Sequence, residues 1–225
     1  MPETFDCSVP ASLLAGVRAA RQALQTGGLV VMPTDTVYGI AADAFDADAV
    51  AGLLAAKGRD RQSPPPVLVP DLATLSALAE QVSDDVRALA EAFWPGPLTI
   101  IVRAQPSLSW DLGETRGTVA LRMPANDVAL GLLAETGPLA VSSANLHGEP
   151  ASTTAAEPAA ALASSVAVVL DAGEVGEGYE PHADGERAQN GSTIVDATGE
   201  RIRIVRQGVL ARERIAEIVG EALEP

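Results

Sequence analysis

The basic loop that begins at Lys57 holds side chains that can bind a phosphate group. Lys57 and Arg59 flank a glycine, and Arg61 and Ser63 follow just before three prolines. An ammonium, two forked guanidinium groups and a hydroxyl in so short a segment can hold phosphate oxygens by charge-assisted hydrogen bonds. A helix C-terminus also favours cations, and a helix is expected just before Lys57. The cations and the hydroxyl together exceed what a helix end requires, so the pattern favours a phosphate site.

A second polar cluster, Thr34, Asp35 and Thr36, follows the apolar run 29–33. A tyrosine and a glycine then allow the backbone to turn. The same pattern is typical of an ordinary polar turn. A ligand site is favoured because other predicted strands of this chain also end in polar residues, and open α/β sheets bind their ligands at strand ends.

Two arginines stand at further strand ends. Arg122 lies in the otherwise apolar stretch 119–123, and Arg206 follows the stretch 202–205. A buried guanidinium is costly unless it is paired, so Arg122 must face a carboxylate of the protein or an anionic ligand. The sequence leaves both partners open.

Small polar residues close another apolar stretch at 142–145. Backbone N–H groups in such a turn can bind an anion, although Asn145 could instead close its own turn. A serine nucleophile is not expected, because the only histidines, His147 and His182, stand in no triad pattern. With one cysteine and no clustered histidines, no metal site built from side chains is expected either.

Helical and strand periodicities alternate along the whole chain. Helices are predicted over about 11–26, 46–57, 72–80, 84–93, 126–135, 153–163 and 211–223, with N-caps at Asp46, Asp71, Ser83 and Asn126. Strands are predicted over 29–33, 67–69, 98–103, 118–123, 139–141, 166–170, 192–195 and 202–205, with extended chain over 37–44. Residues 174–191 are rich in Gly, Glu and Asp and lack periodicity, which predicts a mobile surface loop or lid.

The alternating elements predict one α/β domain over residues 1–225, without a linker or an internal repeat. Its β-sheet is expected to be twisted, open and mixed, with helices flanking it. The polar and basic strand ends together predict a central cationic cavity.

The formal net charge of −15 limits the ligands that the surface can bind. A broad nucleic-acid-binding face needs a basic stripe, so this acidic chain can hold an anion only in a local basic pocket. Lys57 is the only lysine among 15 Lys and Arg residues, which is consistent with a place that needs a compact point charge. No export signal opens the chain and no apolar run reaches bilayer length, so a cytoplasmic protein without membrane contact is expected.

Seven ordered motifs together resemble those of the Sua5/YciO/YrdC family. They are Pro33-Thr34-Asp35-Thr36-Val37-Tyr38-Gly39, Lys57-Gly58-Arg59, Trp94-Pro95-Gly96-Pro97-Leu98-Thr99, Val119-Ala120-Leu121-Arg122-Met123-Pro124, Ser142-Ser143-Ala144-Asn145, Ser192-Thr193-Ile194-Val195-Asp196 and Arg206-Gln207-Gly208. The resemblance covers about residues 15–220 and is to the short, single-domain members.

The resemblance implies a YrdC-like fold and a nucleotidyltransferase activity, that of an L-threonylcarbamoyladenylate synthase. Such an enzyme condenses L-threonine, bicarbonate and ATP into threonylcarbamoyl-AMP and releases pyrophosphate. Mg²⁺ would accompany ATP. Downstream partner proteins would use the product for the t6A modification of tRNA next to the anticodon, and the acidic chain itself would not bind tRNA tightly.

The resemblance also implies roles for individual residues. Those expected to bind L-threonine are Thr36, Arg122, Val141 through its backbone, and Ser192. Those expected to bind ATP are Arg59, Ser63, Thr118, Ser143, Ala151 and Arg206. Lys57 and Arg59 would act in catalysis by positioning the phosphates and neutralising their charge.

The chain departs from the family pattern after its basic loop. Ser63 stands at an Asn position, Pro65 at a Leu position and Leu68 at that of a His that contacts threonine. Gln207 replaces the Pro of an Arg-Pro-Gly motif, and Ala151 stands at the position of a Ser. A related carbamoyl-adenylating enzyme with another acceptor therefore stays open as an alternative.

An RNA-binding or ribosome-maturation module of the same fold is the alternative from another class. The net charge of −15 disfavours it unless the cavity itself binds RNA. Salt-dependent RNA binding without ATP turnover would indicate this function.

Overall fold

A ten-stranded mixed sheet forms the centre of the chain in the computed structural model, which describes residues 1–146, 149–184 and 187–225. The strand order is β1-β8-β2-β3-β7-β4-β6-β5-β11-β12. The strands of this sheet are β1 (Glu3–Asp6), β2 (Leu29–Met32), β3 (Gly39–Asp43), β4 (Val67–Leu68), β5 (Leu98–Arg103), β6 (Thr118–Arg122), β7 (Leu139–Ser143), β8 (Val166–Asp171), β11 (Thr193–Asp196) and β12 (Arg203–Arg206). Parallel pairs such as β2 with β8 and antiparallel pairs such as β3 with β7 confirm the expected mixed sheet.

The helices begin close to where their capping residues predict. They are α1 (Pro10–Gln25), α2 (Ala47–Ala56), α3 (Leu72–Leu78), α4 (Asp84–Phe93), α5 (Asp127–Thr136), α6 (Ala156–Ala161) and α7 (Arg212–Val219), followed by the short 3₁₀ helix η1 (Gly220–Ala222). Asp46, Asp71, Ser83 and Asn126 each accept hydrogen bonds from backbone N–H groups in the first turn of the helix that follows. These side chains satisfy N–H groups that have no partner within the helix.

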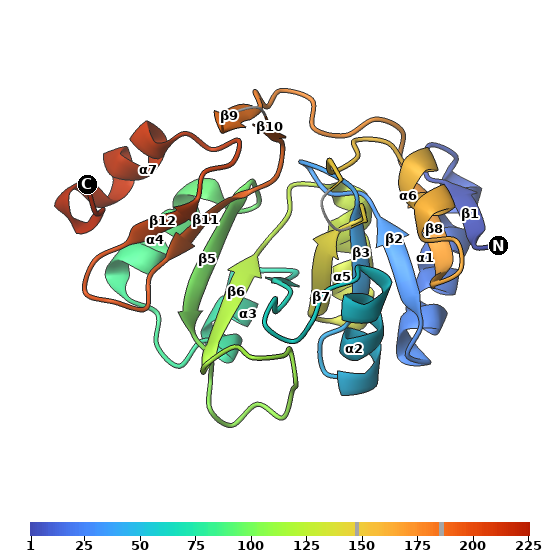
Figure 1. The fold of residues 1–225 in the computed structure, drawn as a ribbon, viewed down its shortest axis with the longest axis horizontal. Helices are drawn as coiled ribbons and strands as arrows, with labels where there is room; N and C mark the ends of the chain where they lie inside the picture. Colours follow the sequence, from blue (N-terminus) through green and yellow to red (C-terminus); the bar gives the residue numbers. More distant parts are fainter. Residues whose placement is uncertain (147–148, 185–186) are drawn as a thin grey trace.

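Helices cover both faces of the sheet around β2 and β3, where the strand residues are almost all buried. Val30 and Met32 of β2 pack with α1 and α5, whereas Leu29 and Val31 pack with α2 and the region of α6. A third cluster joins α3, α4 and α7 to β5, β6 and β11. Figure 1 shows α4 and α7 at one end of the molecule and α1 and α6 at the other.

Two parts of the chain differ from the pattern expected from sequence. Residues Glu3–Asp6 form β1, which pairs in parallel with β8. Within 174–191, β9 (His182–Asp184) and β10 (Arg187–Gln189) form a separate antiparallel pair, with residues 185–186 outside the described part of the chain. Figure 1 shows this segment passing over the top of the large sheet on its way from β8 to β11. Its mobility stays a prediction.

Within the described residues, no helix has the length and apolar character needed to span a bilayer.

Helix α2 matters for the site because its C-terminus presents Lys57, so its N-cap offers a test of how the fold positions that lysine. Asp46 Oδ1 accepts hydrogen bonds of 3.0 Å from the N–H groups of Asp48 and Ala49. We expect Asp46→Ala to lower the free energy of unfolding by about 1 kcal/mol in urea denaturation, because both N–H groups lose their acceptor. Asp46→Asn keeps an acceptor and should stay close to the original protein, so an equal loss in both variants would contradict the capping role.

Candidate active site

A buried ion pair joins the end of β6 to the loop after β2. Arg122 Nη2 lies 2.6 Å from Asp35 Oδ1, and the two side chains are only 7% and 5% exposed. Both terminal nitrogens of Arg122 also lie 3.2 Å from Thr36 Oγ1, and its Nε donates to the Gly96 carbonyl at 3.0 Å. The partner of Arg122 that the sequence left open is thus a carboxylate of the protein itself.

Asp35 is the centre of a larger set of contacts. Its Oδ1 also accepts a 2.9 Å hydrogen bond from the Ala125 N–H, and its Oδ2 accepts one of 3.2 Å from the Tyr179 hydroxyl. Thr34 Oγ1 supports the same loop by donating to the Val37 carbonyl at 2.6 Å. One carboxylate therefore connects three segments that are distant in sequence.

A second polar cluster lies where β5, β11 and β12 meet. Ser192 Oγ is 2.7 Å from Thr99 Oγ1, and Arg206 Nη2 donates to the Ser192 carbonyl at 2.7 Å and to Ser192 Oγ at 3.2 Å. Gly208 passes so close that an added Cβ would lie 2.2 Å from the Gly191 carbonyl oxygen. Only glycine fits there, which explains the glycine two residues after Arg206.

Arg206 shows that the cationic side chains gather in space. Removal of water from its guanidinium, followed by repulsion from Arg122 and Arg59, lowers the pKa of Arg206 to about 10. The residue as a whole is nevertheless exposed. An anion bound beside it would offset the repulsion that Arg122 and Arg59 exert on its guanidinium.

Lys57 is buried, with 1% of its surface exposed, although the sequence suggested a phosphate contact. Its Nζ donates to the Ser143 carbonyl at 2.6 Å, to the Asn145 carbonyl and to Asn145 Oδ1 at 3.2 Å. Burial and repulsion from Arg59 lower the pKa of Lys57 to about 8. Lys57 therefore fixes the turn that follows β7, and its ammonium is already bound to three oxygens of the protein.

The rest of the basic loop divides between the site and the surface. Arg59 Nη1 donates to Ser142 Oγ at 3.3 Å, which directs it toward the end of β7. Arg61 forms a bidentate pair with Asp111 at 2.8 and 3.0 Å, and both side chains are largely exposed. Arg61 thus has a partner outside the cationic cluster. Ser63 is exposed.

The remaining predicted site residues occupy strand ends and turns. Val141 and Ser143 lie in β7, and Thr118 begins β6 with its hydroxyl donating to the Thr115 carbonyl at 2.8 Å. Ala151 is partly buried next to Ser152, whose carbonyl accepts from the Tyr38 N–H at 2.9 Å. Leu68 is the register partner of Arg122 in the parallel pair of β4 and β6.

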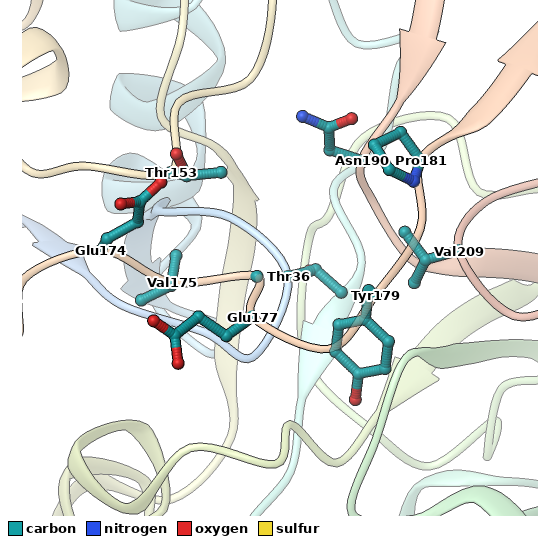
Figure 2. A pocket seen from close by; sticks show the side chains of 10 residues that line it. Thr36, Thr153, Glu174, Val175, Glu177, Tyr179, Pro181, Asn190 and Val209 are labelled. Atoms are coloured by element: carbon teal, nitrogen blue, oxygen red, sulfur yellow. The ribbon is translucent and has the colours of Figure 1, made fainter.

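Two clefts adjoin Thr34, Asp35 and Thr36. The first, of about 160 Å³, is shown in Figure 2, where Thr36 lies between Val175 and Tyr179 in this view. The second, of about 260 Å³, is lined by Thr34, Asp35 and part of the same segment. Among the described residues that line these clefts, none of Lys57, Arg59, Arg122 and Arg206 appears. The cationic cluster therefore lies beside these openings, and a cationic cavity stays a prediction.

Potential metal ligands do not gather anywhere in residues 1–146, 149–184 and 187–225 as a group of three His, Cys, Asp or Glu side chains.

The fold and the strand-end cluster define an α/β protein that gathers hydroxyls and guanidinium groups where strands of a mixed sheet end. Comparison with known sequences gives the family. Residues 22–208 match the Sua5_yciO_yrdC family, which is described as "Telomere recombination". The chain belongs to this Sua5/YciO/YrdC family.

Curated relatives extend the similarity over nearly the whole chain. A protein of Mycobacterium tuberculosis (strain H37Rv) named "Putative threonylcarbamoyl-AMP synthase" is 50% identical over 98% of this chain and 96% of its own length. The threonylcarbamoyl-AMP synthase of Pyrococcus abyssi is 34% identical over 91% of this chain, which spans only 57% of that relative's length.

Solved structures support the same fold. P. abyssi Sua5 complexed with L-threonine superposes with a TM-score of 0.80 at 34% identity, over 91% of this chain and 57% of that one. E. coli YciO superposes with a TM-score of 0.78 over 96% of this chain and all of its own, at 22% identity. At 22% identity, the similarity to E. coli YciO shows a shared fold only.

The sequence did not single out three residues that organise this site. In the sequence, Asp35 is one member of a polar cluster, Thr99 lies inside a motif that assigns it no role, and Tyr179 falls in a segment without periodicity. The role of Asp35 could be predicted from the sequence, because a buried arginine requires a counter-charge and Asp35 is a carboxylate at a strand end. The role of Tyr179 could not.

The state of Lys57 can be measured directly, because it is the only lysine. In protein labelled with ¹³C at the lysine side chain, the single Cε signal should titrate with a midpoint of about 8. In urea the midpoint should return to the ordinary value of about 10.4. The unfolded chain keeps this proton to a higher pH than the folded protein does. The free energy of unfolding should therefore increase as the pH rises from about 8 to about 10.4. A folded-state midpoint at the ordinary value would show that burial and Arg59 do not destabilise the ammonium.

Proposed function

We propose that this protein is an L-threonylcarbamoyladenylate synthase, which joins L-threonine, bicarbonate and ATP and releases pyrophosphate. The observation that carries the proposal is that Arg122 and Arg206 each donate to a buried hydroxyl at a strand end, in a chain of net charge −15. Arg59 and Arg122 lie near enough to Arg206 to lower its pKa. Such a cluster is suited to a polyanionic substrate. The names of the mycobacterial and archaeal relatives support the same reaction.

The threonine end of the site would lie around Thr36 and Arg122. Arg122 already uses Asp35 for one of its nitrogens, while Thr36 Oγ1 lies 3.2 Å from both terminal nitrogens. A threonine carboxylate would meet a guanidinium that is held in a fixed orientation and a hydroxyl beside it. Ser192 and the backbone of Val141 would complete this end. The complex of P. abyssi Sua5 with L-threonine supports an amino-acid site in this fold.

The nucleotide end would lie around Arg59 and Arg206. Arg206 is exposed, and Arg59 is partly so, which leaves both guanidinium groups accessible to phosphate oxygens. Ser63, Thr118, Ser143 and Ala151 would border the rest of the nucleotide. Mg²⁺ carried by ATP would neutralise part of the phosphate charge.

The reaction asks little of side-chain acids or bases. The deprotonated amine of threonine attacks CO₂ derived from bicarbonate and forms a carbamate, with the amine proton passing to solvent. A carbamate oxygen then attacks the α-phosphorus, the bond to the β-phosphate oxygen breaks, and pyrophosphate leaves. Positioning and charge stabilisation by the arginines can supply most of the acceleration.

Lys57 would act in this reaction by supporting the site, without contacting the substrates. Its three hydrogen bonds hold the turn after β7, whose N–H groups and hydroxyls would face the nucleotide. A role as positioning residue is therefore better supported than direct contact with the phosphates.

Transfer of the threonylcarbamoyl group to tRNA would fall to downstream partner proteins. With a net charge of −15, the surface is unsuited to tight binding of tRNA by itself.

Pyrophosphate release tests the proposal most simply. With ATP, Mg²⁺ and bicarbonate, we expect release to depend on L-threonine and to be accompanied by threonylcarbamoyl-AMP, detected by mass spectrometry. Release that is independent of threonine would indicate a different acceptor, and salt-dependent RNA binding without any release would indicate an RNA-binding module.

Arg59 and Arg61 form a matched pair of variants in the same loop. Arg59→Ala should raise the KM for ATP by about 10- to 100-fold, since a hydrogen bond to a charged group contributes about 1.5–3 kcal/mol. Arg61→Ala removes the same charge but only breaks an exposed pair with Asp111, so its KM should stay within about twofold of the original. Equal effects in both variants would show that overall charge, and not the position of Arg59, governs ATP binding.

A further inference from the structure

The segment Glu174–Tyr179, named here the strap, is fixed at its beginning. Tyr38 donates its hydroxyl hydrogen to the Gly173 carbonyl at 2.7 Å, and the Val175 N–H donates to the Thr153 carbonyl at 2.9 Å. Val175 is 8% exposed and packs in the core cluster that includes Tyr38. The first residues of the strap are therefore held by the fold.

The middle of the strap runs close to the proposed threonine site. Gly176 has φ = +90°, and an added Cβ would lie 2.9 Å from the carbonyl oxygen of Thr36. A side chain at this position would have to move either the strap or the loop after β2. The strap thus forms one wall of the cleft beside Thr36, as Figure 2 shows.

A side-chain hydrogen bond joins the end of the strap to the buried ion pair. The Tyr179 hydroxyl lies 3.2 Å from Asp35 Oδ2, while Asp35 Oδ1 holds Arg122 at 2.6 Å. Burial and the nearby Asp35 carboxylate raise the pKa of Tyr179 to about 12, so its hydroxyl remains a donor at neutral pH. Tyr179 thereby takes up one of the lone pairs that would otherwise leave a buried carboxylate incompletely bonded.

We propose that Tyr179 is a positioning residue for L-threonine, which acts through Asp35 on the orientation of Arg122 and holds the strap against the threonine end of the site. The proposal rests on the proposed function for its ligand. It concerns the amino-acid end alone, because Asp35 contacts Arg122 and lies next to Thr36 but contacts neither Arg59 nor Arg206 among the described hydrogen bonds.

Tyr179→Phe removes the hydroxyl and keeps the ring, so it isolates this one contact. We expect the KM for L-threonine to rise by about 3- to 10-fold, the effect of losing one hydrogen bond of ordinary strength, because Tyr179 acts through Asp35 and does not contact the substrate. The KM for ATP should be unchanged. Glu180→Gln alters an exposed side chain one residue further on and should leave both constants unchanged. A Tyr179→Phe enzyme with an unchanged KM for threonine, or with equal increases for threonine and ATP, would overturn the proposal.

A double-mutant cycle tests whether Tyr179 acts through Asp35. In an Asp35→Asn background, where the acceptor has lost its charge, Tyr179→Phe should have a much smaller effect on the KM for threonine than in the original protein. Full additivity of the two changes would contradict an action through Asp35.

Hydrogen exchange of peptides from the strap gives a readout that needs no turnover. The N–H of residue 179, which donates to the Gly176 carbonyl at 3.3 Å, should exchange faster in Tyr179→Phe than in the original protein, with no change in Glu180→Gln. Unchanged exchange would show that Tyr179 does not hold the strap. If exchange rises but no variant forms an adenylate with threonine, the strap contact stands and the proposed function fails.

Discussion

The buried pair of Arg122 and Asp35 is the interaction on which the rest of the site depends. Two ionised groups with 7% and 5% exposure are stable only where each is surrounded by hydrogen-bonding partners. Arg122 finds them in Asp35, Thr36 and the Gly96 carbonyl, and Asp35 in Arg122, the Ala125 N–H and Tyr179. Because both charged groups need these hydrogen-bonding partners, the loop after β2, the end of β6 and the strap lie together.

Charge sets the second constraint. The chain as a whole is strongly acidic, yet Arg59 and Arg122 lie near enough to Arg206 to lower its pKa by repulsion. Asp35 compensates only Arg122 by direct contact, so the other two guanidinium groups remain available. A polyphosphate would supply the missing negative charge, while the acidic surroundings would disfavour larger polyanions such as RNA. The arrangement thus favours a small anionic ligand over a broad nucleic-acid interface.

Elements encoded by local signals were predicted from the sequence with correct type and nearly correct bounds. Asp46 and Asn126 precede helices because a capping side chain and its helix are neighbours in sequence. Strand β5 was evident from its β-branched and apolar residues. In contrast, β1 has four residues and is defined by its pairing with β8, which no local pattern reveals.

The sequence predicts which residues form the site, but not which of them form hydrogen bonds and ion pairs with one another. The motifs placed Thr36, Arg122, Ser192 and Arg206 at strand ends, and the structure brings them into two polar clusters there. The burial of Lys57 and the pairing of Arg61 with Asp111 depend on segments far away in sequence, so nearby residues gave no sign of them. Tyr179 lies in a segment whose composition carries no structural period, and its contact with Asp35 is purely tertiary.

A crystal structure with L-threonine and a non-hydrolysable ATP analogue would test most directly whether the Arg122–Asp35 pair organises a site for both substrates. The expected result is a threonine carboxylate within hydrogen-bond distance of Arg122 and Thr36, phosphate oxygens at Arg59 and Arg206, and an Arg122–Asp35 contact that persists. The opposite result would be a threonine bound elsewhere, or one that displaces Asp35 from Arg122, and it would show that the ion pair merely fills the site when no ligand is bound.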